Sequence, residues 1–423
     1  MPVDAAPPFP VDLVLVGGDI GVYALARAFH EEYGTIASVI ARKVAGPVAD
    51  SVILEAREVG MDASEEQLVA EMIRVGEEKR GQRGVDADPA GRPILLANAD
   101  FLVALIAANR DRLDPLFHLP ILADETLAAV SDKAEFTRLC IEADVPVPRT
   151  VVLDFRDGTA PDVPELDLGW PLVAKAARSS AYSTVTFPGK RKVFEMNSRE
   201  EILDLVDRLV EAGFRDRFVL QEMIPGDDTA MRSVTAYVDS RGEVTLLGGA
   251  RVLLEEHTPT ALGNPAAMFT TDLGDVFDQS VRLLQRTGYR GFANFDVKVD
   301  PRDGVAKFFE VNPRIGRNNQ YMTSAGANVA RPVVADMVES RAIEQIRPNR
   351  EILYSIVPRA LLWRYIVDPA LRARVKAIAR RGTVHPLLYR PEGWRRRAYV
   401  VAAMANQVKK FAQYYRRPSY DGF

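Results

Sequence analysis

Cysteine is almost absent from the sequence, which has one in 423 residues. A single thiol, Cys140, excludes an internal disulfide and fits a reducing compartment. Cys140 lies on the expected inner face of a helix together with Phe136 and Leu139. We therefore expect a buried thiol with a structural role.

Long hydrophobic runs are missing as well. The longest candidate, "FLVALIAA" at 101–108, falls well short of the roughly 18–20 apolar residues that span a bilayer. The first residues, "MPVDAAPPFP", are rich in proline and lack the positive region of a signal peptide. These absences predict a cytoplasmic protein.

Negative charge is scarce near the C-terminal end. Residues 371–423 hold 13 Lys and Arg but only two Asp and Glu, although the whole chain has a formal net charge of −4 at pH 7. The protein thus combines an acidic body with a basic tail. Residues 392–417 are predicted to form a helix, because apolar side chains recur there at three- and four-residue spacing. The stripe consists of Val400, Met404, Val408, Phe411 and Tyr415.

Two roles are open for this tail. The apolar stripe can dock the helix on the body, whose acidic charge the tail would offset. Alternatively, the positive charges meet an anionic partner, either the diphosphate of a nucleotide-linked precursor or a membrane surface. No stretch resembles a nucleic-acid recognition motif, so we expect no nucleic-acid partner.

The N-terminal part alternates strands with helices. Residues 11–34 predict a strand, a tight glycine turn and a helix that opens at Gly21. A strand follows at 37–42, a helix at 65–81, and a further strand–turn–helix unit at 92–113. Alternation of this kind implies a parallel α/β sheet.

The first glycine turn, "GGDIG" at 17–21, lacks the full G-x-G-x-x-G fingerprint of dinucleotide-binding proteins. We interpret the glycines as turn formers, with a substrate-facing role as the alternative. A dinucleotide-dependent oxidoreductase would need an acidic residue at the end of the second strand, where "ASVIARK" is basic.

The strongest chemical signal is "FDVKVDPRDGVAKFFEVNPR" at 295–314. The central "PRDG" predicts a turn between two strands, and side chains alternate faces along each strand. A hairpin folded symmetrically about this turn puts Asp296 opposite Glu310 and Asn294 opposite Asn312. Oxygen-bearing side chains therefore gather on one face, above an apolar face that packs on the core.

Two carboxylates so close together repel unless a cation lies between them. Oxygen ligands without histidine favour Mg²⁺ or Mn²⁺ over zinc. We therefore assign Asp296, Glu310 and Asn312 as metal ligands. The alternative is a surface hairpin with solvated acids, which explains less well the large apolar neighbours and the following Arg314 and Arg317.

In their order and spacing, the motifs between 130 and 335 resemble the ATP-grasp family of carboxylate–amine ligases. The family's metal pattern, Asp and then Glu-x-Asn on the next strand, matches the hairpin. Lys133 in "SDKAEF" and Lys175 in "PLVAKA" match two lysines that contact the nucleotide phosphates. The stretch "VLQEMIPGDD" matches the hinge over adenine and ribose. By that match, the nucleotide-binding residues of the hinge are Gln221, Glu222, Met223, Ile224 and Asp228.

The phosphate-covering loop departs from the family pattern. It is usually rich in glycine, but here it contains "ARSSAYSTVTFPGKRKVF". Ser179 and Ser180 offer hydroxyl and backbone donors to the phosphates, and Gly189 with Lys190 to Lys192 would form the flap.

A closer resemblance joins "GGDIGVYALARAFHEEYG" and "FFEVNPRIGRNNQYMTSAGANV" to the D-aspartate ligase group of the family. These enzymes attach D-aspartate to a lysine side chain of a peptidoglycan precursor. The resemblance implies an ATP- and Mg²⁺-dependent reaction (or Mn²⁺) through an acyl phosphate. The substrates would be an amino acid and a precursor amine. A homodimer is also implied, since ATP-grasp relatives often dimerise.

The resemblance also suggests roles for three arginines. Arg314 would hold the acceptor carboxylate and then the acyl phosphate, because guanidinium pairs with both in a bidentate fork. Arg317 or Arg251 would hold a second carboxylate, as aspartate requires, with a surface ion pair as the alternative. His257, in the long irregular stretch 255–272, is expected to be solvated, with uptake of the amine proton as the alternative.

The implied fold class is α/β, with an N-terminal parallel α/β domain at 1–125. A two-subdomain, α+β ATP-grasp domain would follow at 126–340, its small nucleotide-gripping subdomain at about 150–225. A basic helical extension would end the chain at 341–423. The alternatives are another small-molecule ligase, such as a dipeptide synthetase, and a nucleotide-binding regulator without turnover. The intact Asp–Glu–Asn set argues against the regulator.

Overall fold

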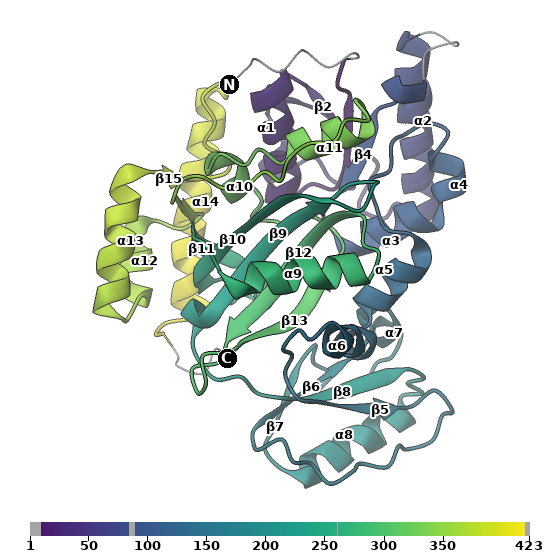
Figure 1. Cartoon of the computed structure of the whole chain (residues 1–423), viewed down its shortest axis with the longest axis vertical. Helices are drawn as coiled ribbons and strands as arrows, with labels where there is room; N and C mark the ends of the chain where they lie inside the picture. Colours follow the sequence, from purple (N-terminus) through teal and green to yellow (C-terminus); the bar gives the residue numbers. More distant parts are fainter. Residues whose placement is uncertain (1–9, 84–88, 260, 419–423) are drawn as a thin grey trace.

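The computed structural model describes residues 10–83, 89–259 and 261–418. Its strands form three sheets, which follow one another along the length of the molecule (Figure 1). The first is a four-stranded parallel sheet of order β3-β2-β1-β4, which confirms the predicted parallel α/β unit. Its strands are β1 (Leu13–Val16), β2 (Ala37–Ala41), β3 (Leu54–Glu58) and β4 (Ile94–Ala97). The helices and turns of this part are α1 (Ile20–Tyr33), η1 (Gly46–Val48), α2 (Glu65–Arg83), η2 (Pro89–Gly91), α3 (Asp100–Ala108) and α4 (Arg110–Leu113).

Helix α1 begins one residue before the predicted Gly21. The reason is Asp19, whose carboxylate accepts hydrogen bonds from the backbone N–H groups of Gly21 and Val22 at 2.9 and 3.0 Å. An N-cap of this kind satisfies donors that have no partner within the helix. Helix α1 ends at Gly34, whose φ of 68° is left-handed and costs glycine little.

The second sheet has seven strands in the order β13-β12-β9-β10-β11-β14-β15. One face shares a core with α1. The other shares a core with α2 and α3 of the N-terminal part, with α9 (Asp275–Arg286) and with the helices before the small sheet. Its strands are β9 (Met231–Val238), β10 (Val244–Glu255), β11 (Pro265–Thr270), β12 (Gly291–Val299), β13 (Ala306–Asn312), β14 (Leu353–Ser355) and β15 (Thr383–Val384). The elements around it are α5 (Asp124–Ser131), α6 (Lys133–Glu142), η3 (Asp228–Ala230), α9 (Asp275–Arg286), α10 (Gln320–Ser324) and α11 (Ala330–Met337).

Two features of this sheet differ from the sequence expectations. The stretch 255–272 is not irregular throughout, because β11 lies within it and pairs with β10. The segment after residue 340 is not purely helical, because β14 and β15 extend the same sheet. Short strands at a sheet edge carry too few residues for a period-two pattern to show in the sequence.

The third sheet is four-stranded and antiparallel, in the order β5-β8-β6-β7. It has its own core, in which the rings of Tyr182, Phe214 and Phe218 meet edge to face. This small unit lies below the seven-stranded sheet in Figure 1. Its elements are β5 (Thr150–Asp154), β6 (Leu172–Ala176), α7 (Ser179–Ser183), β7 (Phe194–Met196), α8 (Arg199–Glu211) and β8 (Arg217–Glu222).

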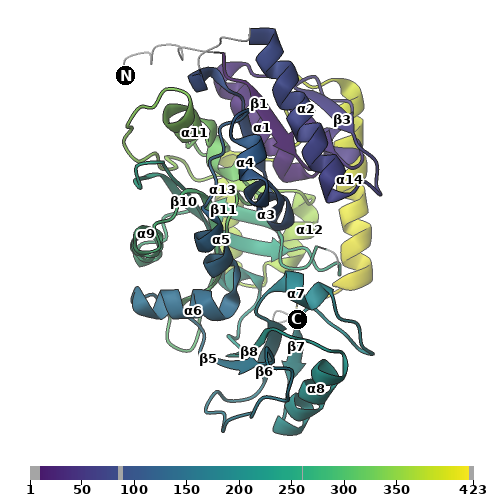
Figure 2. The same ribbon diagram turned by 90° about the vertical axis from the view of Figure 1, so that its right-hand side faces the viewer.

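The basic tail forms α14 (Trp394–Tyr414) and docks on the body, after α12 (Arg359–Tyr365) and α13 (Pro369–Arg381). Figure 2 shows α14 running down one side of the molecule from the N-terminal sheet. Val400, Phe411 and Tyr415 of the predicted stripe are buried, and Met404 is partly buried. Val408 is 41% exposed, so the stripe covers less of the helix than its spacing suggested.

Cys140 is buried as predicted, and burial raises the pKa of its thiol. Among the helices that the structure describes, none has the length and apolarity to cross a bilayer.

Arg396 anchors the start of α14 and is only 2% exposed. Its guanidinium donates hydrogen bonds to the carbonyls of Gly46, Pro47 and Ala49 and lies 4.3 Å from the ring centroid of Tyr23. Tyr23 in turn donates from its hydroxyl to Glu392 at 2.9 Å. A buried cation with several acceptors therefore ties the tail to the N-terminal part.

Replacing Arg396 by alanine should lower the free energy of unfolding by about 2–3 kcal/mol, because the carbonyls lose their buried donor. The control is Arg397→Ala, which removes the same charge from the exposed neighbour and should change stability by no more than about 0.5 kcal/mol. Urea unfolding followed by circular dichroism measures both. Equal effects of the two variants would contradict this account of the anchor.

Candidate active site

The β12–β13 hairpin has the register that the sequence predicts. Asp296 lies directly opposite Glu310, and Asn294 opposite Asn312. The register shifts by one residue only beyond Asp296, toward the turn. Because the shift lies outside the polar set, the three predicted metal ligands stay on one face of the sheet.

The two carboxylates of the hairpin have opposite electrostatic surroundings. Burial and the nearby Glu310 raise the pKa of Asp296 to about 7. Burial alone would also raise the pKa of Glu310, but Lys133 and Lys175 outweigh it and hold that pKa below its usual range. The Lys133 ammonium lies 3.4 Å from the Glu310 carboxylate. Asn312 closes the set, since its amide N–H donates to Asp296 at 3.0 Å.

This donor set fits a hard divalent cation. It offers two carboxylates and an amide oxygen and no sulfur or imidazole, which suits Mg²⁺ or Mn²⁺. A cation would also relieve the repulsion that raises the pKa of Asp296. Across the described parts of the chain, no three His, Cys, Asp or Glu side chains come together as metal ligands would, and the hairpin itself supplies two carboxylates and an amide.

The two predicted phosphate lysines converge on this hairpin from different elements. Lys133 is the first residue of α6, which Asp132 caps. The backbone N–H of Lys133 donates to the carbonyl of Ala177 at 3.1 Å. Lys175 lies in β6, with its ammonium 5.8 Å from the centroid of the Phe309 ring. Burial, and then Lys133, lower the pKa of Lys175 to about 8. Two cations held so near each other favour a polyanion between them.

Ser179 and Ser180 begin α7, directly after the β6 strand of Lys175. Their side chains lie outside what the structure describes, so the phosphate role assigned to them stays a prediction. Hydrogen bonds hold part of the predicted flap against the segment before it. The Lys190 ammonium donates to the carbonyls of Tyr182 and Val185 at 2.9 and 2.5 Å.

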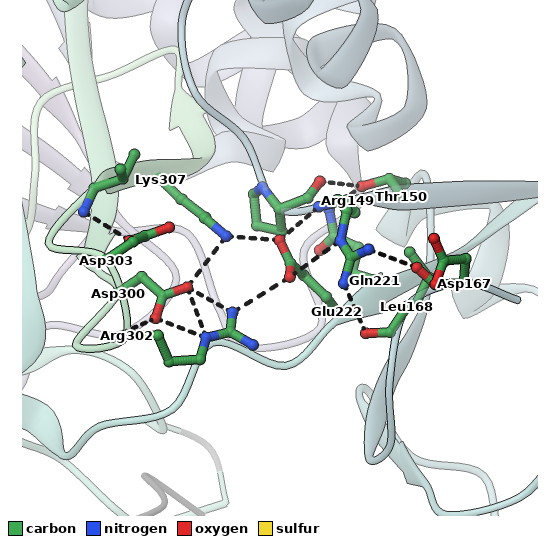
Figure 3. Close-up of polar contacts among 12 residues, drawn as sticks. Arg149, Thr150, Asp167, Leu168, Gln221, Glu222, Asp300, Arg302, Asp303 and Lys307 are labelled. Atoms are coloured by element: carbon green, nitrogen blue, oxygen red, sulfur yellow. Dashed lines mark hydrogen bonds and ion pairs between the residues drawn. The ribbon is translucent and has the colours of Figure 1, made fainter.

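Glu222, a residue of the predicted hinge, ends β8 and is 4% exposed. Its carboxylate accepts hydrogen bonds from the Lys307 ammonium at 2.8 Å, the Arg149 backbone N–H at 2.9 Å and Arg302 at 3.3 Å (Figure 3). Lys307 and Arg302 also bind Asp300 on the hairpin. Glu222 therefore joins the small sheet to the seven-stranded sheet, a role that the sequence did not reveal.

The neighbouring residues of the predicted hinge are buried or half-buried. Gln221 donates from its amide to the Thr150 hydroxyl at 3.0 Å. Ile224 is buried and Met223 half-buried. No contact here tests the adenine-lining role of these residues, which remains a prediction.

The predicted ribose ligand, Asp228, is buried and already has partners. It accepts from the Glu255 backbone N–H at 2.9 Å and lies 3.1 Å from the His257 ring. Burial, then Asp228 and Asp296, raise the pKa of Glu255 to about 8. The expectation of a solvated His257 is wrong, because its ring stacks on Tyr415 with centroids 3.5 Å apart. The sequence did not indicate this contact, because the tail residue Tyr415 reaches the loop of His257 only in the folded protein.

Two of the three predicted substrate arginines meet acids of the N-terminal part. Arg314 lies 2.8 Å from Asp100. Arg317 lies 3.3 Å from Asp19 and donates to the buried Glu256 at 2.6 Å. The sequence carried a signal for these partners, since Asp19 and Asp100 follow the adjacent parallel strands β1 and β4. Carboxyl ends of parallel strands share one edge, where α/β proteins bind ligands.

The first glycine turn supports this edge by close packing. A Cβ at Gly21 would lie 2.0 Å from the Asn98 amide nitrogen and 2.9 Å from the Arg317 Cα. Glycine there lets α1 approach the loop of Arg317. This agrees with the interpretation of the turn glycines as structural.

The structure does not bring Arg251 to the other two arginines. Arg251 pairs across the sheet with Arg232, whereas Asp296 pairs with the next residue, Ser233. Neighbouring strand residues point to opposite faces, so Arg251 lies on the face away from the hairpin carboxylates. It donates to the carbonyl of Thr229 at 2.9 Å. Arg251 therefore has no place beside Arg314.

Comparison with known proteins supports the family assignment. No family model matches the chain. A D-aspartate ligase of Enterococcus faecium (strain Aus0004) is 30% identical over 360 residues, covering 83% of this chain and 84% of that protein.

Two solved structures share the fold. The L-amino acid ligase from Bacillus licheniformis has a TM-score of 0.55 at 15% identity, covering 82% of this chain and 80% of its own. The biotin carboxylase domain dimer of the Hydrogenobacter thermophilus 2-oxoglutarate carboxylase, in complex with MgADP, has a TM-score of 0.56 at 18% identity. The match covers 80% of this chain and 73% of that one. The chain belongs to the D-aspartate ligase family and is an ATP-dependent carboxylate–amine ligase with the ATP-grasp fold.

Proposed function

We propose that this ligase joins the carboxylate of D-aspartate, or of a similar amino acid, to an amine of a peptidoglycan-precursor peptide. The observation that carries the proposal is the contact between Arg314 and the hairpin. Its guanidinium donates to the Asn312 amide oxygen at 3.1 Å. A carboxylate held by Arg314 would therefore lie beside the phosphate-binding and metal-binding groups, as transfer of a phosphoryl group onto that carboxylate requires.

Arg317 suits the second carboxylate of aspartate. Glu256 is 2% exposed and keeps Arg317 oriented, whereas the Asp19 side chain is 38% exposed. A guanidinium has five N–H donors, enough for Glu256 and a substrate carboxylate together. A substrate could take the place of Asp19 without leaving Glu256 unpaired.

ATP and Mg²⁺ are the proposed cosubstrate and cofactor, with Mn²⁺ as a cation that the same donors accept. The cation would be held by Asp296, Glu310 and Asn312, and it would neutralise phosphate charge during transfer. Binding of MgADP by the biotin carboxylase domain of the same fold supports this choice.

The remaining steps fall to side chains of the chain. Lys133 and Lys175 would neutralise the nucleotide phosphates while a substrate carboxylate oxygen attacks the γ-phosphorus and ADP leaves. Arg314 would then pair with the acyl phosphate. Attack by the acceptor amine on the carbonyl carbon forms the amide, releases inorganic phosphate and loses one proton.

Two further proposals follow from the same function. We place the enzyme in the cytoplasm, where ATP is available. We also propose a homodimer, which the dimeric biotin carboxylase domain of the same fold supports.

The test is Mg²⁺-dependent ADP release with a panel of D- and L-amino acids, with and without a nucleotide-linked muramyl pentapeptide. We expect release only when D-aspartate and the pentapeptide are both present. Release with another pair would replace the substrates and keep the ligase chemistry. If no pair gives release although ATP binds, the proposed substrates are wrong.

A further inference from the structure

A hollow of about 330 Å³ lies between α12 and α13, outside the active site. It is lined by Arg359, Trp363, Lys376, Ala379 and Arg380. It is an open depression on the surface and not an enclosed cavity. None of these residues belongs to the hairpin, the hinge or the phosphate lysines.

The lining is built from two matched helical pairs. Arg359 and Trp363 are four residues apart on α12, and Lys376 and Arg380 are four residues apart on α13. Residues at this spacing share one face of a helix, so each helix presents two side chains to the hollow. Ala379 is 7% exposed and leaves room at its base.

The three cations of the hollow lack anionic partners. Within the described ranges, neither Arg359 nor Lys376 nor Arg380 forms an ion pair. Arg374 on the same helix, by contrast, pairs with Glu351 at 2.8 Å. The Lys376 ammonium instead lies 5.7 Å from the Trp363 ring centroid. The three cations are exposed and line one hollow, where an anion would find several positively charged donors.

The chemistry of the lining specifies the anion. Two guanidinium groups and one ammonium can together neutralise two or more negative charges, and guanidinium matches phosphate oxygens in a bidentate fork. The half-buried Trp363 ring adds an apolar wall. A single carboxylate would leave most of these donors unused.

We propose that the α12–α13 hollow is a second anion site, which binds a diphosphate-class group. That group can belong to a soluble nucleotide diphosphate or to the phosphate headgroup of a lipid. This proposal does not depend on which amino acid the enzyme activates. It can therefore be tested separately from the proposed function.

Trp363 supplies a local readout. Titration of the full-length protein with inorganic pyrophosphate should change tryptophan fluorescence saturably, and Trp363→Phe should abolish the change. Pyrophosphate bound at the active site would not give a signal that depends on Trp363. Absence of any Trp363-dependent change at millimolar pyrophosphate would overturn the proposal.

The charge test compares a double variant of the lining with a single control variant on the same helix. Lys376→Ala with Arg380→Ala should raise the dissociation constant for pyrophosphate at this site tenfold or more. The control, Arg381→Ala, removes an exposed cation of α13 that does not line the hollow and should change it less than twofold. Equal weakening by the control would show only a general charge effect and would reject the site.

The source of the phosphate is decided with two further probes. Uridine diphosphate that competes with pyrophosphate would identify a soluble ligand. Vesicles of phosphatidylglycerol and phosphatidylcholine that bind the wild type but not the Lys376→Ala, Arg380→Ala variant would identify a lipid headgroup. Either result supports the site, and failure of both probes together with pyrophosphate rejects it.

Discussion

Replacing Glu310 by glutamine is expected to reduce Mg²⁺-dependent ADP release by about 10²–10³-fold, the range found when one electrostatic group is removed from a preorganised site. Glu310 is the hairpin carboxylate that stays charged, because Lys133 and Lys175 hold its pKa low. The substitution removes that charge without changing the size of the side chain. It leaves the lysines without their anionic partner and the proposed cation with one carboxylate fewer.

The fold should survive this substitution. The Glu310 side chain is 37% exposed, and among the described residues it forms one ion pair, with Lys133 at 3.4 Å. The unfolding midpoint should therefore stay close to that of the wild type. The matched control is Glu195→Gln on the exposed side of β7, which should leave both activity and stability unchanged.

Measuring the binding of an ATP analogue distinguishes a loss of metal binding from a loss of the catalytic step alone. In the wild type, Mg²⁺ should tighten binding of an ATP analogue, and in Glu310→Gln this dependence on Mg²⁺ should largely disappear. Activity near the wild-type level in Glu310→Gln would show that the metal assignment is wrong.

Replacing Glu222 by alanine is expected to lower the free energy of unfolding by about 3–5 kcal/mol, because it removes one partner of a buried ionic network. Lys307, whose side chain is 12% exposed, would lose its shorter contact and keep only Asp300. The Arg149 backbone N–H would lose its acceptor. The variant would also loosen the junction between the small sheet and the seven-stranded sheet, so affinity for ATP should fall as well.

At low pH, Glu222 should no longer contribute to the free energy of unfolding. Burial alone would raise its pKa, but hydrogen bonds from Lys307 and the Arg149 backbone outweigh burial, and the pKa in the folded state lies below its ordinary value. A carboxyl with a lowered folded-state pKa stabilises the fold above its unfolded pKa of roughly 4.3 and loses this contribution as pH falls through the folded value. The stability gap between wild type and Glu222→Ala should therefore be full at pH 7 and shrink below about pH 4.

The control is Asp154→Asn in the same small sheet. Asp154 pairs with Arg156 at 2.5 Å, but the two side chains are 44% and 63% exposed, and exposed pairs contribute only about 0–1 kcal/mol. Urea unfolding at several pH values compares the variants. A Glu222→Ala protein as stable as Asp154→Asn would contradict the network as a structural junction.

The sequence by itself determined the local elements of the site. Alternation of side chains and a "PRDG" turn specified the hairpin, so the pairing of Asp296 with Glu310 was predictable before any contact was known. The capping residue Asp132 likewise directly precedes Lys133, the first residue of α6. Such features depend on residues within about one turn or one hairpin of each other, where spacing along the chain fixes spacing in the molecule.

Only the tertiary structure decided which distant groups meet. It stacked His257 on Tyr415 of the tail, and it decided which acid each arginine meets. It also turned Arg251 to the far face of its sheet, although this arginine looked equivalent to Arg317 in the sequence. These outcomes depend on strand order, on the face each strand presents and on where α14 docks. Contacts between residues more than a hundred positions apart leave no period in the sequence, because loop lengths and packing, rather than local spacing, determine them.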